Sequence, residues 1–242
     1  MSKFRMFAAA AAVVFTINAQ AQSIDEIVNK HIEARGGAEK LKGIKTLVIE
    51  NSMTMQGMEI PMKQMIATGR GLRMEISVMG NEMITAIDGT KGWAIRPAMM
   101  GGTGEPEDLP ADQIKSSTSQ LDPAGPLFNY KEKGTKVELV GKEPVDKKEN
   151  YHLKVTTKEG TLVDYFLDAN TFLLTKQVAS LNMQGQDVRQ EMNFSDYKEV
   201  SGIKFPHTME TASPMGGDMT VTTNKITVNG PIDEKIFVKP TK

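Results

Sequence analysis

Methionine is concentrated in one short part of this sequence, where five occur within NSMTMQGMEIPMKQM, residues 51–65. A thioether sulfur is a soft ligand that prefers Cu(I), so closely spaced methionines are one signature of copper binding. Met53-Thr-Met55 places two such sulfurs on one face of a strand, and either His207-Thr-Met209 or Trp93 would complete the site. The pattern therefore predicts a copper(I) site as one of two interpretations.

The same methionines fit a second chemistry, which is the binding of hydrocarbon. Methionine has three rotatable bonds and a polarizable sulfur, so a wall rich in this residue adapts to ligands of variable shape. Burying one CH2 group contributes about 0.8 kcal/mol, so an acyl chain is held without specific polar contacts. We favour this interpretation, which needs no metal and no cofactor. The residues expected to line a hydrophobic cavity are Met53, Met55, Met58, Ile60, Met62, Met74, Ile76 and Trp93 on early strands, with Leu127 and Phe128 from a covering segment.

Motifs of enzyme catalysis are missing from the sequence. It contains no GxSxG elbow, no HExxH, no Walker lysine loop and no EF-hand loop. The three histidines, His31, His152 and His207, are widely spaced, and no nucleophile–base pair is evident in the sequence. We therefore expect core or surface histidines and a protein that is not an enzyme.

The first element expected after the N-terminus is an amphipathic helix. Ser23 and Glu26 fit a capping box, in which Ser23 caps the helix and Glu26 occupies its third position. Apolar residues then recur at helical spacing up to Gly36-Gly37, a pair that ends helices.

Beyond this helix, apolar and polar residues alternate, which is the period of a half-buried strand. Leu47, Ile49, Met53 and Met55 share one face of the first strand, and Gln56-Gly57 marks a hairpin turn. Because alternation resumes after each turn, we expect a meander of antiparallel strands.

Residues 97–134 interrupt this alternation with a Gly/Pro-rich loop and a short helix near 111–121, and strands then resume to the end. Strands with one polar and one apolar face favour a sheet that is covered on one side. We predict a mainly β (α+β) fold: a single strongly curved antiparallel sheet, or half-open β-barrel, of about eleven strands. The N-terminal helix and short central helices would cover its concave face.

The N-terminus has the anatomy of a secretory signal peptide. Lys3 and Arg5 precede an apolar run, and Ala19-Gln20-Ala21 is a small-residue cleavage signal. We predict residues 1–21 as a cleaved signal peptide and 22–242 as a single domain. Because the sequence has no cysteine, it offers neither a disulfide nor the residue that N-terminal lipid attachment of the bacterial lipoprotein kind requires, so we expect a free periplasmic protein.

The charge balance excludes one class of partner. Removing Lys3 and Arg5 lowers Lys+Arg from 29 to 27 against 30 Asp+Glu, so the mature net charge is about −3. No basic stripe is present, and nucleic acid is therefore not an expected partner. We expect a monomer.

The segment ATGRGLRMEISV…ITAIDGTKGWAIRPAM, residues 67–99, has a strand pair with an arginine at its start and then a D-G-x-x-x-W strand. Asp88, Gly89 and Trp93 are the fixed positions of that strand. In this order and spacing the sequence resembles the periplasmic LolA/LolB-like outer-membrane lipoprotein-sorting proteins. Weaker similarities, which extend the resemblance over most of the mature chain, lie at residues 122–128, 165–177 and 229–240.

The resemblance implies an eleven-stranded half-open barrel with a helical lid, which holds the acyl chains of lipoproteins or other lipids during transit. It also implies partners among the inner- and outer-membrane lipoprotein transfer components. In the family's carriers an arginine hydrogen-bonds the lid, and by position this residue is Arg70, with Arg73 as the local alternative. Gly71 follows Arg70 here, where the family has proline.

Two other functions stay open at this point. One is a methionine-rich periplasmic copper(I)-binding protein. The other is a non-transporting envelope-assembly domain with a filled interior, because a shared fold does not fix function.

Overall fold

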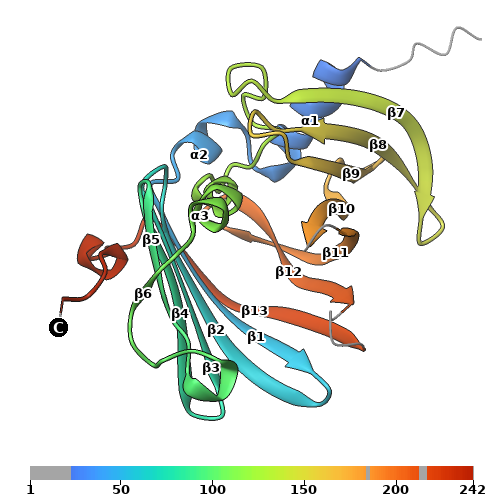
Figure 1. The fold of residues 1–242 in the computed structure, drawn as a ribbon. Helices are drawn as coiled ribbons and strands as arrows, with labels where there is room; N and C mark the ends of the chain where they lie inside the picture. The colour runs from blue at the N-terminus through green and yellow to red at the C-terminus, as the bar shows by residue number, and fades with distance from the viewer. Residues whose placement is uncertain (1–22, 184–185, 213–216, 242) are drawn as a thin grey trace, which may run out of the picture.

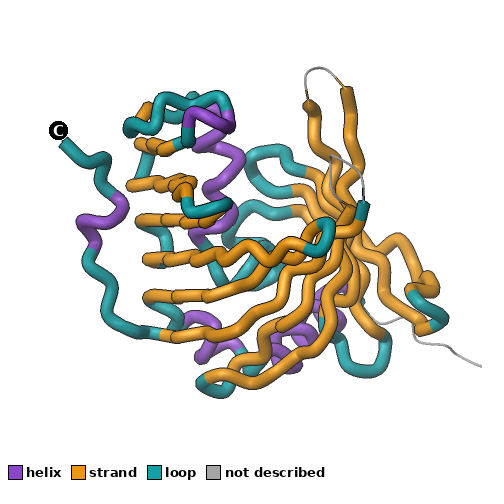
Figure 2. Tube along the Cα trace, turned by 90° about the horizontal axis from the view of Figure 1, so that it is seen from below, coloured by secondary structure: helices purple, strands orange, loops and turns teal. Residues whose placement is uncertain are grey.

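The described residues of the computed structural model are 23–183, 186–212 and 217–241. The predicted signal peptide, residues 1–21, lies outside them. Thirteen antiparallel strands within the described ranges form one sheet, in the order β6-β5-β4-β3-β2-β1-β13-β12-β11-β10-β9-β8-β7. Figures 1 and 2 show that the sheet is strongly curved and stays open. The predicted mainly β fold with a curved, unclosed sheet is confirmed.

The elements follow one another in two strand meanders separated by a helical segment. The helices are α1 (Ile24–Arg35), α2 (Ala38–Lys42) and α3 (Ala111–Ser117), with 3-10 helices η1 (Ala98–Met100), η2 (Thr118–Leu121) and η3 (Glu234–Phe237). The strands are β1 (Thr46–Met55), β2 (Met58–Ala67), β3 (Gly71–Val78), β4 (Asn81–Asp88), β5 (Lys91–Ile95), β6 (Glu107–Asp108), β7 (Lys136–Val145), β8 (Lys148–Thr156), β9 (Leu162–Asp168), β10 (Leu174–Met183), β11 (Gln186–Val200), β12 (Ile203–Ala212) and β13 (Asp218–Val228).

Local sequence signals account for the boundaries of the first elements. The side chain of Ser23 accepts a hydrogen bond from the Glu26 N–H at 3.2 Å, as the capping box predicts. The helix ends at Gly36, whose φ of 128° is open to glycine. Gln56 and Gly57 both have positive φ, which gives the hairpin of β1 and β2 the twist its strands need.

The core lies between the helices and the inner, concave face of the sheet. Ile27 and Ile32 of α1 pack in one cluster with Leu47 of β1, Ile66 of β2 and Leu72 of β3. The covering segment of residues 111–134, called the lid below, joins β6 to β7 and adds four apolar side chains to this cluster. These are Leu121, Ala124, Leu127 and Phe128.

The lid is fixed to both the helix and the sheet. The Gly69 N–H, in the turn between β2 and β3, donates to the Leu121 carbonyl at 2.9 Å. The Tyr130 hydroxyl donates to Asp25 of α1 at 2.6 Å. No helix in the described ranges is long and apolar enough to cross a bilayer.

Candidate functional site

The strand register brings the predicted methionines of the first hairpin together. Met53 lies opposite Ile60, and Met55 lies opposite Met58. Residues directly opposite each other in an antiparallel pair point to the same side of the sheet. Leu47, which alternates onto the same side of β1, packs in the core with α1, so this is the inner face.

The neighbouring strand continues this face. Met62 of β2 lies opposite Ile76 of β3, and Met74 lies opposite Gln64 with the same parity. All seven strand residues predicted on β1–β3 therefore share the inner face, as their alternation indicated.

The same face extends onto strands that come much later in the chain. Met53 lies opposite Val221 of β13, and Val221 lies opposite Met209 of β12. Met209 lies opposite Phe194 of β11, so one apolar row crosses four strands. A parallel row adds methionines of β11 and β13. Eight methionines on these strands share the inner face, and together they form the methionine face: Met53, Met55, Met58, Met62, Met74, Met192, Met209 and Met219.

The methionine face is half-buried. Met53, Met55, Met62 and Met74 are intermediate in exposure, and Met58 is 43% exposed. Figure 1 shows the helices α1, α2 and α3 gathered at the end of the sheet where β1 begins. The methionines of β1 lie at its other end, so this part of the inner face is an open, curved wall. Leucine and isoleucine occupy the covered part.

A polar residue, Asn51, lies in the next row of the inner face, between Met62 of β2 and Thr223 of β13. Its side chain is 7% exposed, and its Oδ1 has no hydrogen-bond partner among the described residues. Leaving a buried acceptor unpaired costs about 1–3 kcal/mol. This part of the face is therefore not optimised for stability alone.

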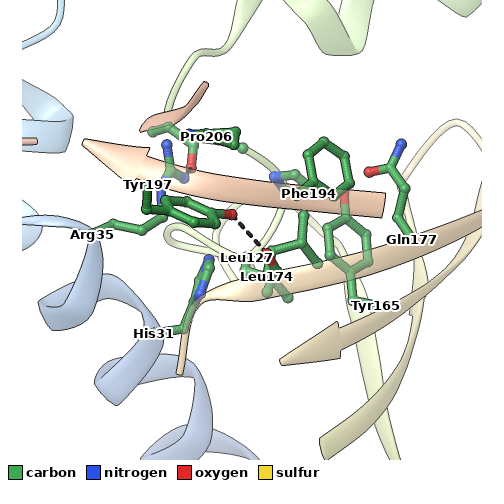
Figure 3. A pocket seen from close by; sticks show the side chains of 12 residues that line it. His31, Arg35, Leu127, Tyr165, Leu174, Gln177, Phe194, Tyr197 and Pro206 are labelled. Atoms are coloured by element: carbon green, nitrogen blue, oxygen red, sulfur yellow. Dashed lines mark hydrogen bonds between the residues drawn. The ribbon is translucent and has the colours of Figure 1, made fainter. Parts of the chain in front are cut away.

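A small pocket lies where α1, the lid and strands β9–β12 meet (Figure 3). Its volume is about 190 Å³. The Tyr197 hydroxyl donates to the Leu174 carbonyl at 2.8 Å in its wall. The lining residues are His31, Arg35, Ala124, Gly125, Pro126, Leu127, Tyr165, Leu174, Gln177, Phe194, Tyr197 and Pro206.

Arg35, in the last turn of α1, holds the lid from inside this pocket. Its Nη1 donates to the Ala124 carbonyl at 2.6 Å, and its Nη2 donates to the Pro123 carbonyl at 3.1 Å. Leu127 follows on the same lid and is 2% exposed, with Phe128 beside it at 8%. The two predicted lid residues are thus core residues, and Leu127 also lines the pocket.

Burial controls ionisation around the pocket. His31 is 5% exposed, and its Nδ1–H donates to the Phe172 carbonyl at 2.8 Å. Burial, and secondarily the charge of Arg35, lower the pKa of His31 to about 4, so it is neutral at pH 7. Burial also raises the pKa of Tyr165 to about 12 and lowers the pKa of Arg35. Arg35 remains the cation of this site.

Acid is expected to destabilise the fold through His31. The pKa of His31 is about 4 when folded against 6.5 for the free side chain, so only the unfolded chain binds a proton between these values. The contribution of neutral His31 to the free energy of unfolding is fully present above pH 6.5 and is lost as the pH falls toward 4. We expect a loss of roughly 3 kcal/mol in the free energy of unfolding. Urea unfolding from pH 7 to pH 4 measures it, and His31→Gln should lack this part of the slope. Equal slopes would contradict the assignment.

Solved structures show which fold this is. No family model and no curated protein sequence matches the chain. A LolA superfamily protein from Nitrosomonas europaea superposes with a TM-score of 0.60 at 13% identity, covering 90% of this chain and 99% of that one. The chain has the LolA-like fold. A protein described as an outer membrane lipoprotein-sorting domain, from Vibrio parahaemolyticus, has a TM-score of 0.55 at 14% identity, with coverages of 88% and 95%. A DUF1329 family protein from Desulfovibrio piger has a TM-score of 0.58 at 13% identity, covering 88% of this chain and 96% of that one.

Within this LolA-like fold, Trp93 faces away from the methionines. It lies opposite Ala86 on β4, which lies opposite Arg73 on β3, and that row has the parity of the outer face. The Trp93 Nε1–H donates to the Phe237 carbonyl at 2.8 Å. Trp93 is buried at 3% exposure because the C-terminal segment covers it from outside. Its expected place in the ligand site is therefore corrected.

Arg70 is also placed differently from the expectation. Its guanidinium is ion-paired with Glu234 of η3 and lies 3.9 Å from Asp88, both outside the lid. Arg73, the local alternative, donates to the Ile236 carbonyl at 3.0 Å. Both arginines therefore hold the C-terminal segment, and Arg35 of α1 makes the contacts with lid carbonyls. The sequence carried one signal for this placement of Arg35: its four-residue spacing from His31, which puts both side chains on the same face of α1.

The histidines do not assemble a catalytic group in the LolA-like fold. His152 contacts Glu143 at 2.8 Å and Asp164 at 3.0 Å, and His207 donates to the Phe205 carbonyl at 3.1 Å. Across the described ranges, no three His, Asp or Glu side chains come together as a metal site. The copper(I) alternative, which depends on thioethers, stays a prediction.

Proposed function

We propose that the chain is a non-catalytic carrier that binds acyl chains of lipoproteins or other lipids on the methionine face. The observation that carries this proposal is the half-exposed row of flexible apolar side chains along the uncovered inner face. Within this row Met58 is 43% exposed, whereas a packed core would bury a methionine side chain. A contiguous exposed apolar surface of this kind marks a binding site more often than a solvated face.

The chemistry of the wall suits hydrocarbon of variable shape. The thioether chains of Met53, Met55 and Met209 can change rotamer to follow a ligand, whereas branched side chains are stiffer. Binding would gain mainly from removing apolar surface from water, which requires no reacting group.

The proposal includes a periplasmic location after cleavage of residues 1–21, and exchange of cargo with lipoprotein transfer components of the two membranes. Its support is the LolA-like fold, shared at a TM-score of 0.55 with a protein described as a lipoprotein-sorting domain. The envelope-assembly alternative predicts no binding of acyl chains and is separated by the same experiment.

The affinity for straight-chain alcohols of 8, 10 and 12 carbons tests the proposal. Each added pair of methylenes is expected to tighten binding by about 15-fold, because a single buried methylene contributes about 0.8 kcal/mol. Isothermal titration calorimetry with the mature protein gives the dissociation constants. An absence of binding, or an affinity independent of chain length, would overturn the proposal.

A further inference from the structure

The position of Arg35 in the fold is unusual for a charged side chain. Arg35 extends the stripe of Ile27 and His31 on α1, at four-residue spacing, and this stripe faces the core. The guanidinium forms no ion pair with a carboxylate of the described residues. Asp122, whose charge favours the ionised form of Arg35, is itself ion-paired with Lys133. The pocket therefore contains a cation without a neutralising partner.

Only part of the hydrogen-bonding capacity of Arg35 is used by the lid. A guanidinium has five N–H donors in a fork that matches an oxyanion, and two of them reach the carbonyls of Pro123 and Ala124. His31, beside it, is neutral and has given its Nδ1–H to Phe172. A largely buried cation with spare donors, at the wall of a pocket, suits an anionic group that brings its own charge.

The pocket is continuous with the row of side chains on the methionine face. Phe194 lines the pocket and also lies opposite Met209, which leads through Val221 to Met53. The pocket volume of 190 Å³ equals that of about six water molecules in the liquid. This is room for an anionic group and a few carbons, so a longer tail must continue outside it.

We infer that Arg35 binds the anionic head of a single-chain amphiphile, a carboxylate or a phosphate monoester, whose tail crosses Phe194 onto the methionine face. This inference rests on the proposed function, since it names the class of lipid that the carrier would hold. Figure 3 shows Arg35 and Phe194 among the residues that line this pocket.

A matched pair of ligands tests the inference on the unaltered protein. Dodecanoate at pH 8 and dodecanol have the same tail, but the ionised head of dodecanoate is better hydrated and therefore harder to bury. Without a cation in the pocket, dodecanoate would be the weaker ligand. Because Arg35 would pair with its carboxylate, we expect dodecanoate to bind at least tenfold more tightly than dodecanol. Equal affinities would overturn the role of Arg35 and leave the carrier proposal intact, whereas binding of neither ligand would overturn both. A third ligand, dodecyl phosphate, shows whether the pocket prefers a carboxylate or a phosphate.

Two arginine variants locate the preference. Arg35→Gln is expected to remove the tenfold preference, so that dodecanoate binds no more tightly than dodecanol. Arg70→Gln makes the same change on the outer surface, where the arginine contacts Glu234, and should keep the preference. A preference that persists in Arg35→Gln would overturn the inference. If this variant fails to fold, the comparison of ligands on the unaltered protein still decides.

Discussion

Replacing Phe237 with alanine is expected to lower the free energy of unfolding by about 3–5 kcal/mol. The side chain is 0% exposed, although it belongs to the C-terminal segment on the outer face of the sheet. Its ring lies directly on the backbone of β3, because a Cβ at Gly71 would come within 2.6 Å of it. Its carbonyl accepts the hydrogen bond of the buried Trp93 indole, so removing the ring also loosens that acceptor.

Urea unfolding monitored by the fluorescence of Trp93, the single tryptophan, measures this loss. The matched control is Val238→Ala, the next residue, which is 50% exposed and should change stability by no more than about 0.5 kcal/mol. Gly71→Ala is expected to destabilise in the same direction, since its Cβ would displace the ring. A loss below about 1 kcal/mol in Phe237→Ala would show that this segment does not hold the sheet.

The strands and their faces were predictable from the sequence because both depend on local alternation. The hairpin of β1 and β2 illustrates this, since one turn at Gln56-Gly57 fixes the register of twenty residues. The pairing of β1 with β13 was not predictable in the same way. It places Leu47 opposite Val228, and no local pattern says which distant edges meet. The sheet has thirteen strands where about eleven were expected, and one of the added strands, β6, is two residues long, too short to show a period.

Trp93 was predicted on the inner face because its cover, like the β1–β13 pairing, comes from a distant part of the chain. An aromatic residue on a strand with one buried face is expected to point inward, but β5 is buried on both faces. The cover on its outer face comes from Phe237, 144 residues further along the chain. This cover also gives a physical reason for Gly71, because the Phe237 ring occupies the space that any side chain there would need.

The role of Arg35 was only partly visible in the sequence. Its spacing from Ile27 and His31 places it on the buried stripe of α1. Its partners, the carbonyls of Pro123 and Ala124, lie in a lid whose path depends on tertiary packing. Alternation could identify Met53 and Met55 as inner residues, but their continuation to Met209 required the β1–β13 pairing.

Replacing Met53 with glutamate is expected to weaken the binding of dodecanol by roughly 100-fold, because a carboxylate in this row must lose water when hydrocarbon covers it. Met53 stands between Ile60 and Val221, in the row that leads to Phe194. It is half-buried in the ligand-free protein, so the charge remains partly hydrated there and stability should change much less than affinity. Calorimetric titration and urea unfolding measure the two effects separately.

Thr54→Glu is the matched control, because it adds the same charge one residue away on the exposed, outer face of β1. Its affinity for dodecanol should stay within about twofold of the unaltered protein, since the added charge does not have to be desolvated. Met53→Leu with Met55→Leu keeps the wall apolar and should preserve dodecanol binding, whereas a copper(I) site would lose its thioether ligands. If Met53→Glu bound dodecanol as tightly as Thr54→Glu, the tail would have to lie away from this row. The outward-facing row that contains Glu50 and Lys63 offers charged side chains instead, which do not suit a hydrocarbon tail.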